Sequence, residues 1–126
     1  MTYMCIFCDI YKKNINLIYE DSLVFSIYDN FPVSKGHVLI ITKRHVEDYF
    51  SLTKEEKISI DKAIMFMKNF IDLNFKPDGY NIGINNGVAA GQTISHLHVH
   101  LIPRYQGDVE NPKGGVRGVI PNKQKY

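Results

Sequence analysis

Most apolar residues of this chain fall into short runs, which polar segments containing Gly or Pro separate. The runs of strand length lie at residues 17–21, 23–29, 37–42, 80–85 and 96–102. The run HVLIIT at 37–42 is continuous and rich in β-branched residues, which favours a central strand buried on both faces. In HLHVHLI at 96–102 polar and apolar positions alternate, and we expect Pro103 to end that strand.

One longer segment has the spacing of a helix. Thr53 and Glu56 form a T-x-x-E capping box. Beyond it, apolar residues recur at helical spacing and define a wide face, formed by Ile60, Ala63, Ile64, Met67 and Ile71 and widened by Phe66, Phe70 and Leu73. A helix with so wide an apolar face is buried within its own chain, the interpretation we favour, or is covered by a second subunit as well.

Together these elements predict an α+β fold with a mainly antiparallel sheet of about five strands, one long helix and short helical segments. A chain of 126 residues fits a single domain, here residues 1–126, and the Gly- and Pro-rich residues 107–126 are expected to form an extended C-terminal tail.

Composition narrows the classes of partner. The net charge of +2 is too small to indicate a nucleic-acid or membrane partner, and no apolar run approaches the ~20 residues of a membrane helix. The first ten residues lack the features of a signal peptide, so we expect a cytoplasmic protein.

The candidate chemistry is concentrated in SHLHVHLIPRY at 95–105. Because side chains alternate along a strand, His96, His98 and His100 share one face. Three rings in register suit either a metal site or phosphoryl chemistry. The preceding loop NNGVAAGQT at 85–93 offers backbone and amide donors for phosphate oxygens. No Asp or Glu occurs between Gly79 and Arg104 to complete a catalytic metal site, so we favour phosphate.

The signature His-Leu-His-Val-His-Leu-Ile at 96–102 resembles that of the histidine triad superfamily. GHVLI with His37, AGQT at 90–93 and PRYQGD at 103–108 extend the resemblance over nearly the whole chain. The last two segments are most similar to the fragile histidine triad branch, whose members cleave dinucleoside polyphosphates such as diadenosine tri- or tetraphosphate. The resemblance implies the histidine triad fold, a homodimer and an adenine nucleotide as substrate.

The resemblance also implies roles for single residues. His98 would attack the α-phosphate and become a nucleotidyl-histidine, His100 would contact the phosphate, and His37 would help to orient the site. Asp29 and Asn85 would contact the ribose. The remaining implied nucleotide contacts are the phosphate contacts Gly91, Gln92 and Thr93 and the base-pocket residues Ile6, Phe7, Ile10 and Ile27. The scheme demands no divalent ion in the chemistry, and magnesium enters only with the substrate. Arg104 and Arg117 are weaker candidates for the distal phosphates.

Cys5 and Cys8 are spaced as half of a zinc site. Some bacterial members of the family carry a Cys-Cys-His-His zinc site that includes the first triad histidine, which implies a structural zinc on Cys5, Cys8, His45 and His96. A local twist or a position at the end of the strand must then turn His96 away from His98 and toward the cysteines. The alternative is two reduced, buried thiols and a surface His45.

Three other functions stay open at this point. The substrate could be an adenosine phosphoramidate instead of a dinucleoside polyphosphate. The chain could also be a zinc-stabilised nucleotide-binding module with little catalysis, or a metal-dependent hydrolase that uses all three histidines of the triad.

Overall fold

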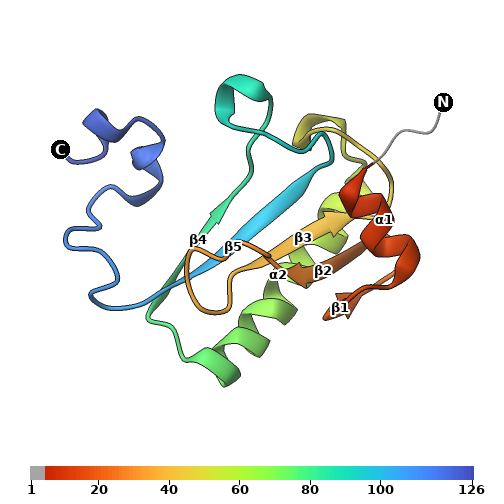
Figure 1. Cartoon of the computed structure of the whole chain (residues 1–126), viewed down its shortest axis with the longest axis horizontal. Coiled ribbons are helices and arrows are strands. Elements are labelled where there is room, and N and C mark those ends of the chain that lie inside the picture. The colour runs from red at the N-terminus through yellow and green to blue at the C-terminus, as the bar shows by residue number, and fades with distance from the viewer. Residues whose placement is uncertain (1–4) are drawn as a thin grey trace.

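The computed structural model describes residues 5–126, which form one five-stranded antiparallel sheet and two α-helices (Figure 1). The strand order in the sheet is β1-β2-β3-β5-β4. The strands are β1 (Tyr19–Glu20), β2 (Val24–Tyr28), β3 (Val38–Thr42), β4 (Gly79–Gly83) and β5 (His98–Arg104), and the helices are α1 (Ile6–Lys13) and α2 (Lys54–Phe75). This arrangement confirms the predicted α+β fold class.

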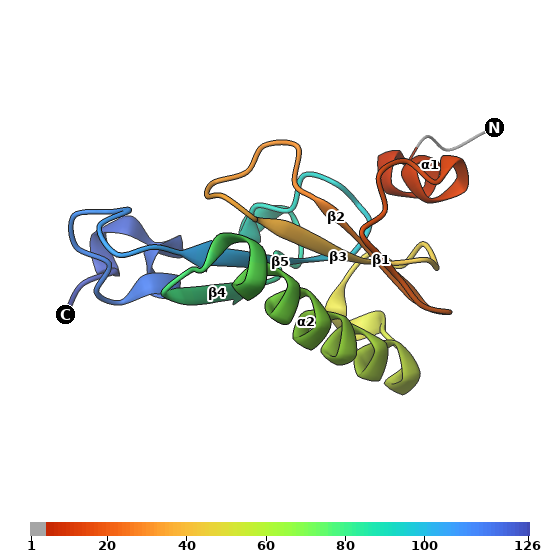
Figure 2. The ribbon, with the colours of Figure 1, turned by 90° about the horizontal axis from the view of Figure 1, so that it is seen from below.

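The two helices cover opposite faces of the sheet (Figure 2). The larger core lies between α2 and the inward side chains of the strands, and includes Val24, Val38, Ile40, Val99 and Leu101. The smaller core lies under α1 and is formed by Phe7, Phe25, Ile27, Leu39 and Ile41. Every residue of β3 is buried, which confirms the prediction of a central strand covered on both faces.

Helix α2 begins where the sequence predicts. The Thr53 side chain accepts the backbone N–H of Glu56, and the Glu56 side chain accepts the N–H of Thr53, so the capping box is present. The face toward the sheet is buried, as expected for a core helix. The widened part of the apolar face is only partly covered by residues 5–126, because Phe70 packs against the core whereas Phe66 is 51% and Leu73 79% exposed.

Strand β5 differs from its prediction at both ends. It begins at His98, so His96 lies before the strand in a bend. It also continues through Pro103, which does not end it. A residue's N–H and C=O point to the same side of a strand. The Pro103 carbonyl points to the Ser34 hydroxyl, on the side where β3 has already ended at Val38, so the missing N–H costs no ladder bond.

Two further segments were not anticipated in detail. No helix was predicted at α1, although Phe7, Ile10 and Tyr11 follow helical spacing. The C-terminal residues, expected as an extended tail, contain the 3-10 turns Gly115–Val119 and Pro121–Lys123, and the first of these packs near β4. Within residues 5–126, no helix combines the length and the apolar character that crossing a membrane requires.

Candidate functional site

A pocket of about 410 Å³ opens on the α1 side of the sheet, and we call it the histidine pocket. It is bounded by α1, by the loop between β2 and β3, and by the loop that precedes β5. All but one of the residues predicted for catalysis and nucleotide binding line it: His37, His98, His100, Asp29, Asn85, Gly91, Thr93, Ile6, Phe7, Ile10 and Ile27. Segments far apart in the sequence therefore meet where the resemblance implies.

The exception is Gln92. Its side-chain carbonyl accepts the N–H of Gly87 at 2.8 Å, and its side-chain N–H groups donate to the carbonyls of Glu47 at 2.8 Å and Ile94 at 3.0 Å. Both ends of the amide thus brace the glycine loop, and Gln92 is not among the residues that line the histidine pocket. We therefore omit it from the proposed phosphate contacts.

The two candidate arginines also lie elsewhere. Arg104 binds Asp108 through Nε and Nη2 at 2.8 and 2.9 Å and Asn81 through Nη1 at 2.7 Å. Arg117 donates to backbone carbonyls of the C-terminal segment. Neither side chain lines the histidine pocket.

Several lining residues went unrecognised in the sequence. Asn30, Phe31 and Val33 follow Asp29 in the loop between β2 and β3, and Leu39 and Ile94 complete the set. The apolar stretch FPV at 31–33, in a loop between two predicted functional residues, was the available signal.

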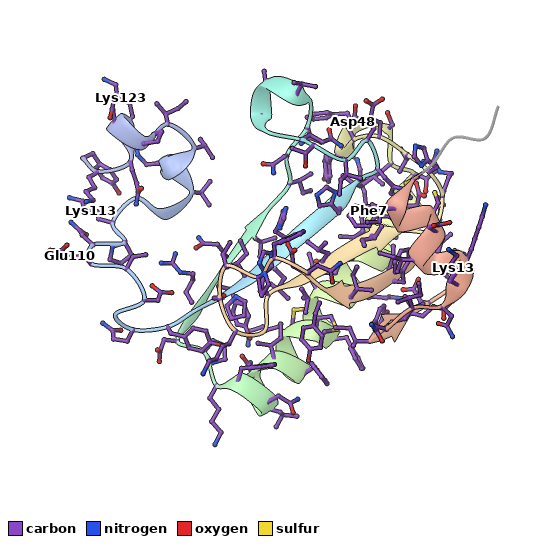
Figure 3. The ribbon with its side chains drawn as sticks, viewed as in Figure 1. Phe7, Lys13, Asp48, Glu110, Lys113 and Lys123 are labelled. Carbon is purple, nitrogen blue, oxygen red and sulfur yellow. The ribbon has the colours of Figure 1, made fainter. Side chains whose placement is uncertain are left out.

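The His98 ring is held in one tautomer by its neighbour. Nδ1 lies 2.8 Å from the backbone carbonyl of His96, and a carbonyl can only accept, so Nδ1 carries the proton. In the neutral ring Nε2 then holds the free lone pair. Phe7 packs against the ring from α1, with centroids 5.0 Å apart, and Figure 3 shows this side chain extending from the helix toward the strands. A neutral His98 is thus presented with the free nitrogen that a nucleophile requires.

A second chain of hydrogen bonds orients His100. The N–H of Val33 donates to Nδ1 of His37 at 3.2 Å, so the proton of neutral His37 resides on Nε2. That Nε2–H donates to Nδ1 of His100 at 3.0 Å, which leaves the proton of His100 on its own Nε2. Oδ2 of Asp29 lies 3.4 Å from His37 Nε2 and 3.9 Å from His100 Nδ1. His98 and His100 are therefore complementary, one with Nε2 as acceptor and one with Nε2–H as donor.

Charge considerations agree with this assignment. Burial, together with the neighbouring rings of His98 and His37 and against the opposing effect of Asp29, lowers the pKa of His100 to about 4. Burial also lowers the pKa of His37, against the opposing effect of Asp29. Both rings are thus neutral at neutral pH, as the hydrogen-bond pattern requires.

The donor atoms of Asp29, His37 and His100 are close enough together to surround an ion. The N–H of Val33 argues against this use of the cluster, because it keeps the proton of neutral His37 on Nε2. The nitrogen that would face the ion therefore has no lone pair to offer. The arrangement favours a proton-holding relay over a catalytic metal site.

A different cluster suits a metal. Cys5, Cys8, His45 and His96 place one donor atom each within 4.8 Å of one another. Sγ of Cys5 lies 3.3 Å and Sγ of Cys8 3.6 Å from Nδ1 of His96, and Sγ of Cys8 lies 3.3 Å from Nδ1 of His45. Tetrahedral zinc with S and N ligands at ~2.3 and ~2.1 Å separates them by ~3.5 Å. The four residues could therefore hold zinc.

The surroundings of His96 fit that use. Nε2 of His96 lies 2.7 Å from the carbonyl of Thr42 and therefore carries the ring proton. The lone pair of Nδ1 then faces the two sulfurs. Burial lowers the pKa of His96 and keeps the ring neutral, as a metal ligand must be. Because β5 begins only at His98, the bend before it turns His96 away from the histidine pocket, which resolves the conflict noted in the sequence.

Beyond α1 the histidine pocket continues into a larger cavity of about 630 Å³, which we call the apolar cavity. The two share Ile6, Ile10, Ile27 and Asn30. The rest of its wall consists of the apolar Ile15, Leu17 and Ile18, the ring of Tyr28, and the polar Asp9 and Asn16. A planar, weakly polar group linked to a phosphate at His98 would find room there.

Comparison with known proteins fixes the family, because residues 12–107 match the HIT domain. The chain belongs to the HIT domain family. A HIT-like protein of Methanocaldococcus jannaschii is 41% identical over 115 residues, covering 89% of this chain and 88% of that protein. The bis(5'-adenosyl)-triphosphatase of Dictyostelium discoideum is 36% identical over 99 residues, covering 79% of this chain and 66% of that enzyme. The predicted histidine triad resemblance is thus confirmed.

Solved structures of HIT proteins agree with the fold. A HIT family protein from Bacillus anthracis superposes with a TM-score of 0.79 at 42% identity, covering 86% of this chain and 78% of that one. A zinc-bound histidine triad protein from Mycobacterium smegmatis superposes with a TM-score of 0.77 at 34% identity, covering 85% and 79%. The zinc in that relative is consistent with a metal at the cysteine–histidine cluster of this HIT protein.

Proposed function

We propose that this HIT protein is a nucleotide hydrolase or transferase that cleaves dinucleoside polyphosphates at the α-phosphate through a covalent nucleotidyl-histidine. The observation that carries the proposal is the complementary pair in the histidine pocket. His98 offers a nucleophilic Nε2 while His100 offers an Nε2–H donor. The similarity to the Dictyostelium bis(5'-adenosyl)-triphosphatase supports this class of substrate.

In the first displacement Nε2 of His98 attacks the α-phosphorus. A nitrogen–phosphorus bond forms while the bond from phosphorus to the bridging oxygen breaks, and the rest of the polyphosphate leaves with that oxygen. Nε2–H of His100 donates to a phosphate oxygen as charge develops, and the hydroxyl of Thr93, which lines the histidine pocket, can add a second donor. The N–H of Gly91 already donates to the Val88 carbonyl at 2.9 Å. Nδ1–H of His98 keeps its bond to the His96 carbonyl and steadies the cation that forms.

In the second displacement water attacks the phosphorus of the intermediate. An oxygen–phosphorus bond forms, the nitrogen–phosphorus bond breaks, and a nucleoside monophosphate is released. In this proposal Asp29 and Asn85 contact the ribose, and the base lies against Ile6, Ile10 and Ile27 toward the apolar cavity. Phe7 is only 3% exposed, so it supports the His98 ring more than it contacts the base.

The test is trapping of the intermediate. Diadenosine tetraphosphate labelled at the α-phosphates should leave acid-labile label on the wild-type protein and none on a folded His98→Ala variant. Equal label on both proteins, or none on wild type, would reject the proposal. Steady-state comparison of diadenosine tri- and tetraphosphate with an adenosine phosphoramidate would then rank the substrates.

Further properties belong to the same proposal. Zinc at Cys5, Cys8, His45 and His96 serves structure, and magnesium accompanies only the substrate. We propose a homodimer, because Leu73 on α2 and Ile82 on the edge strand β4 are apolar and exposed. We also propose that the protein is cytoplasmic. Light scattering would establish the oligomeric state.

A further inference from the structure

The loop between β2 and β3 carries an exposed aromatic ring at the mouth of the histidine pocket. Phe31 is 87% exposed, yet it lines that pocket. Its backbone is held, since its N–H donates to Oδ1 of Asp29 at 2.8 Å and Pro32 follows it. Figure 2 shows this loop standing above the sheet on the side of α1. A large apolar ring on a restrained loop offers a stacking surface at little entropic cost.

The lining of the two cavities shows which end of a substrate would meet Phe31. The apolar cavity, proposed for the base next to the reacting phosphate, does not include Phe31 in its wall. Phe31 and Val33 line the histidine pocket and not the apolar cavity, and the N–H of Val33 donates to His37, which in turn donates to His100. The loop thus lies beside the relay of His37 and His100, the side on which the proposed scheme places the leaving group.

The charge of the pocket indicates what must hold that leaving group. Among the described residues that line the histidine pocket there is no Lys or Arg, and Asp29 is a carboxylate. A polyphosphate chain therefore meets no cationic side chain within the lining of the histidine pocket. Affinity for the leaving half must come mainly from contacts with its nucleoside, and an aromatic ring is suited to stack on a base.

We propose that Phe31 is a specificity-determining residue that stacks on the base of the leaving nucleotide. The protein then prefers a dinucleoside polyphosphate to a mononucleoside polyphosphate with the same phosphate chain. This inference rests on the proposed cleavage at His98, and it names the half of the substrate that the triad itself does not contact.

The test compares diadenosine tetraphosphate with adenosine tetraphosphate, which carries the same four phosphates and no second nucleoside. We expect Phe31→Ala to lower the ratio of the two kcat/KM values about 10-fold, equivalent to ~1.4 kcal/mol. The loss should appear as a higher KM for diadenosine tetraphosphate at unchanged kcat, because stacking remote from phosphorus binds ground and transition states alike. Phe31→Tyr should keep the wild-type ratio.

A matched control is Phe50→Ala, since Phe50 is 79% exposed and lies outside the pocket lining. In Phe50→Ala the ratio of the two kcat/KM values should equal that of wild type. Thermal denaturation should show that Phe31→Ala, Phe31→Tyr and Phe50→Ala are all folded. An unchanged ratio in Phe31→Ala, or an equal loss for both substrates, would overturn the role of Phe31 while His98 still acquires label. Absence of label on wild type would overturn the cleavage proposal and this inference together.

Discussion

The relay from His37 to His100 makes a prediction that depends on the position of one proton. In His37→Ala the donor to Nδ1 of His100 is lost, and Oδ2 of Asp29, 3.9 Å away, becomes the nearest partner. A carboxylate can only accept, so His100 should move its proton to Nδ1. Nε2 of His100 would then present a lone pair to the phosphate where the wild-type protein presents an N–H.

The size of the effect follows from that exchange. A hydrogen bond to a charged group contributes about 2 kcal/mol, roughly twice a neutral one, so the carboxylate should hold the wrong tautomer strongly. We expect labelling of His98 in a single turnover at saturating substrate to slow about 30-fold, since ~1.4 kcal/mol corresponds to a factor of ten. Label should still form, in contrast to His98→Ala.

A second substitution should restore the rate. In His37→Ala combined with Asp29→Asn, the amide oxygen can still accept the N–H of Phe31, while the amide nitrogen can donate to Nδ1 of His100. The double variant should therefore label faster than the single one, and ring ¹⁵N NMR should show His100 protonated again on Nε2. A single variant with the wild-type rate, or slow labelling with the His100 tautomer unchanged, would refute the reasoning.

Three other predictions concern the metal, the pH dependence and the glycine loop. Purified protein should contain about one zinc per chain, and removing it by chelation or Cys5→Ser should lower Tm and slow labelling, because His96 carries both a metal ligand and the carbonyl that orients His98. A metal-free preparation with full activity and unchanged Tm would contradict this. With its pKa depressed to about 4, native His100 binds no proton between pH 7 and 5 while the unfolded chain does, so stability should fall as the pH is lowered. Between pH 7 and 5 the free energy of unfolding, measured with urea, should fall by about 1 kcal/mol less in His100→Asn than in wild type. An identical fall in both proteins would count against the relay. Gln92→Glu replaces two donated hydrogen bonds with repulsion, so hydrogen exchange at residues 87–94 should accelerate; unchanged protection with weaker nucleotide binding would indicate a direct phosphate contact instead.

Periodicity predicted the elements whose burial is regular. The capping box of Thr53 and Glu56 and the continuous run of β3 were confirmed, because in both cases the local pattern agrees with the tertiary environment. The end of β5 was predicted wrongly, since whether a strand tolerates Pro103 depends on which neighbouring strand has ended beside it. The residues around Pro103 do not show that β3 pairs with β5 only as far as Leu101.

The candidate site divides in the same way. A histidine spacing that recurs every second residue, together with the resemblance, anticipated most of the residues that line the histidine pocket, but wrongly included Gln92 and missed Phe31 and its neighbours in the loop. The sequence could not show that His96 leaves the strand, because the bend depends on contacts such as the bond from Leu97 N–H to the Val46 carbonyl. Nor could it show the tautomers, which depend on backbone groups of Val33 and His96 that no residue identity encodes.

The alternation along β5 has a consequence for how such a protein can vary. His98 and His100 face the pocket while Val99, Leu101 and Pro103 are buried on the opposite face. Inserting or deleting one residue within the strand would exchange these sets, placing imidazoles in the core and aliphatic groups at the phosphate. The register of β5 therefore determines which side chains face the phosphate and which lie in the core. The loops at 29–37 and 85–94 have no such alternation, so substrate preference can change at loop positions outside the relay, such as Phe31, while the reaction itself stays the same.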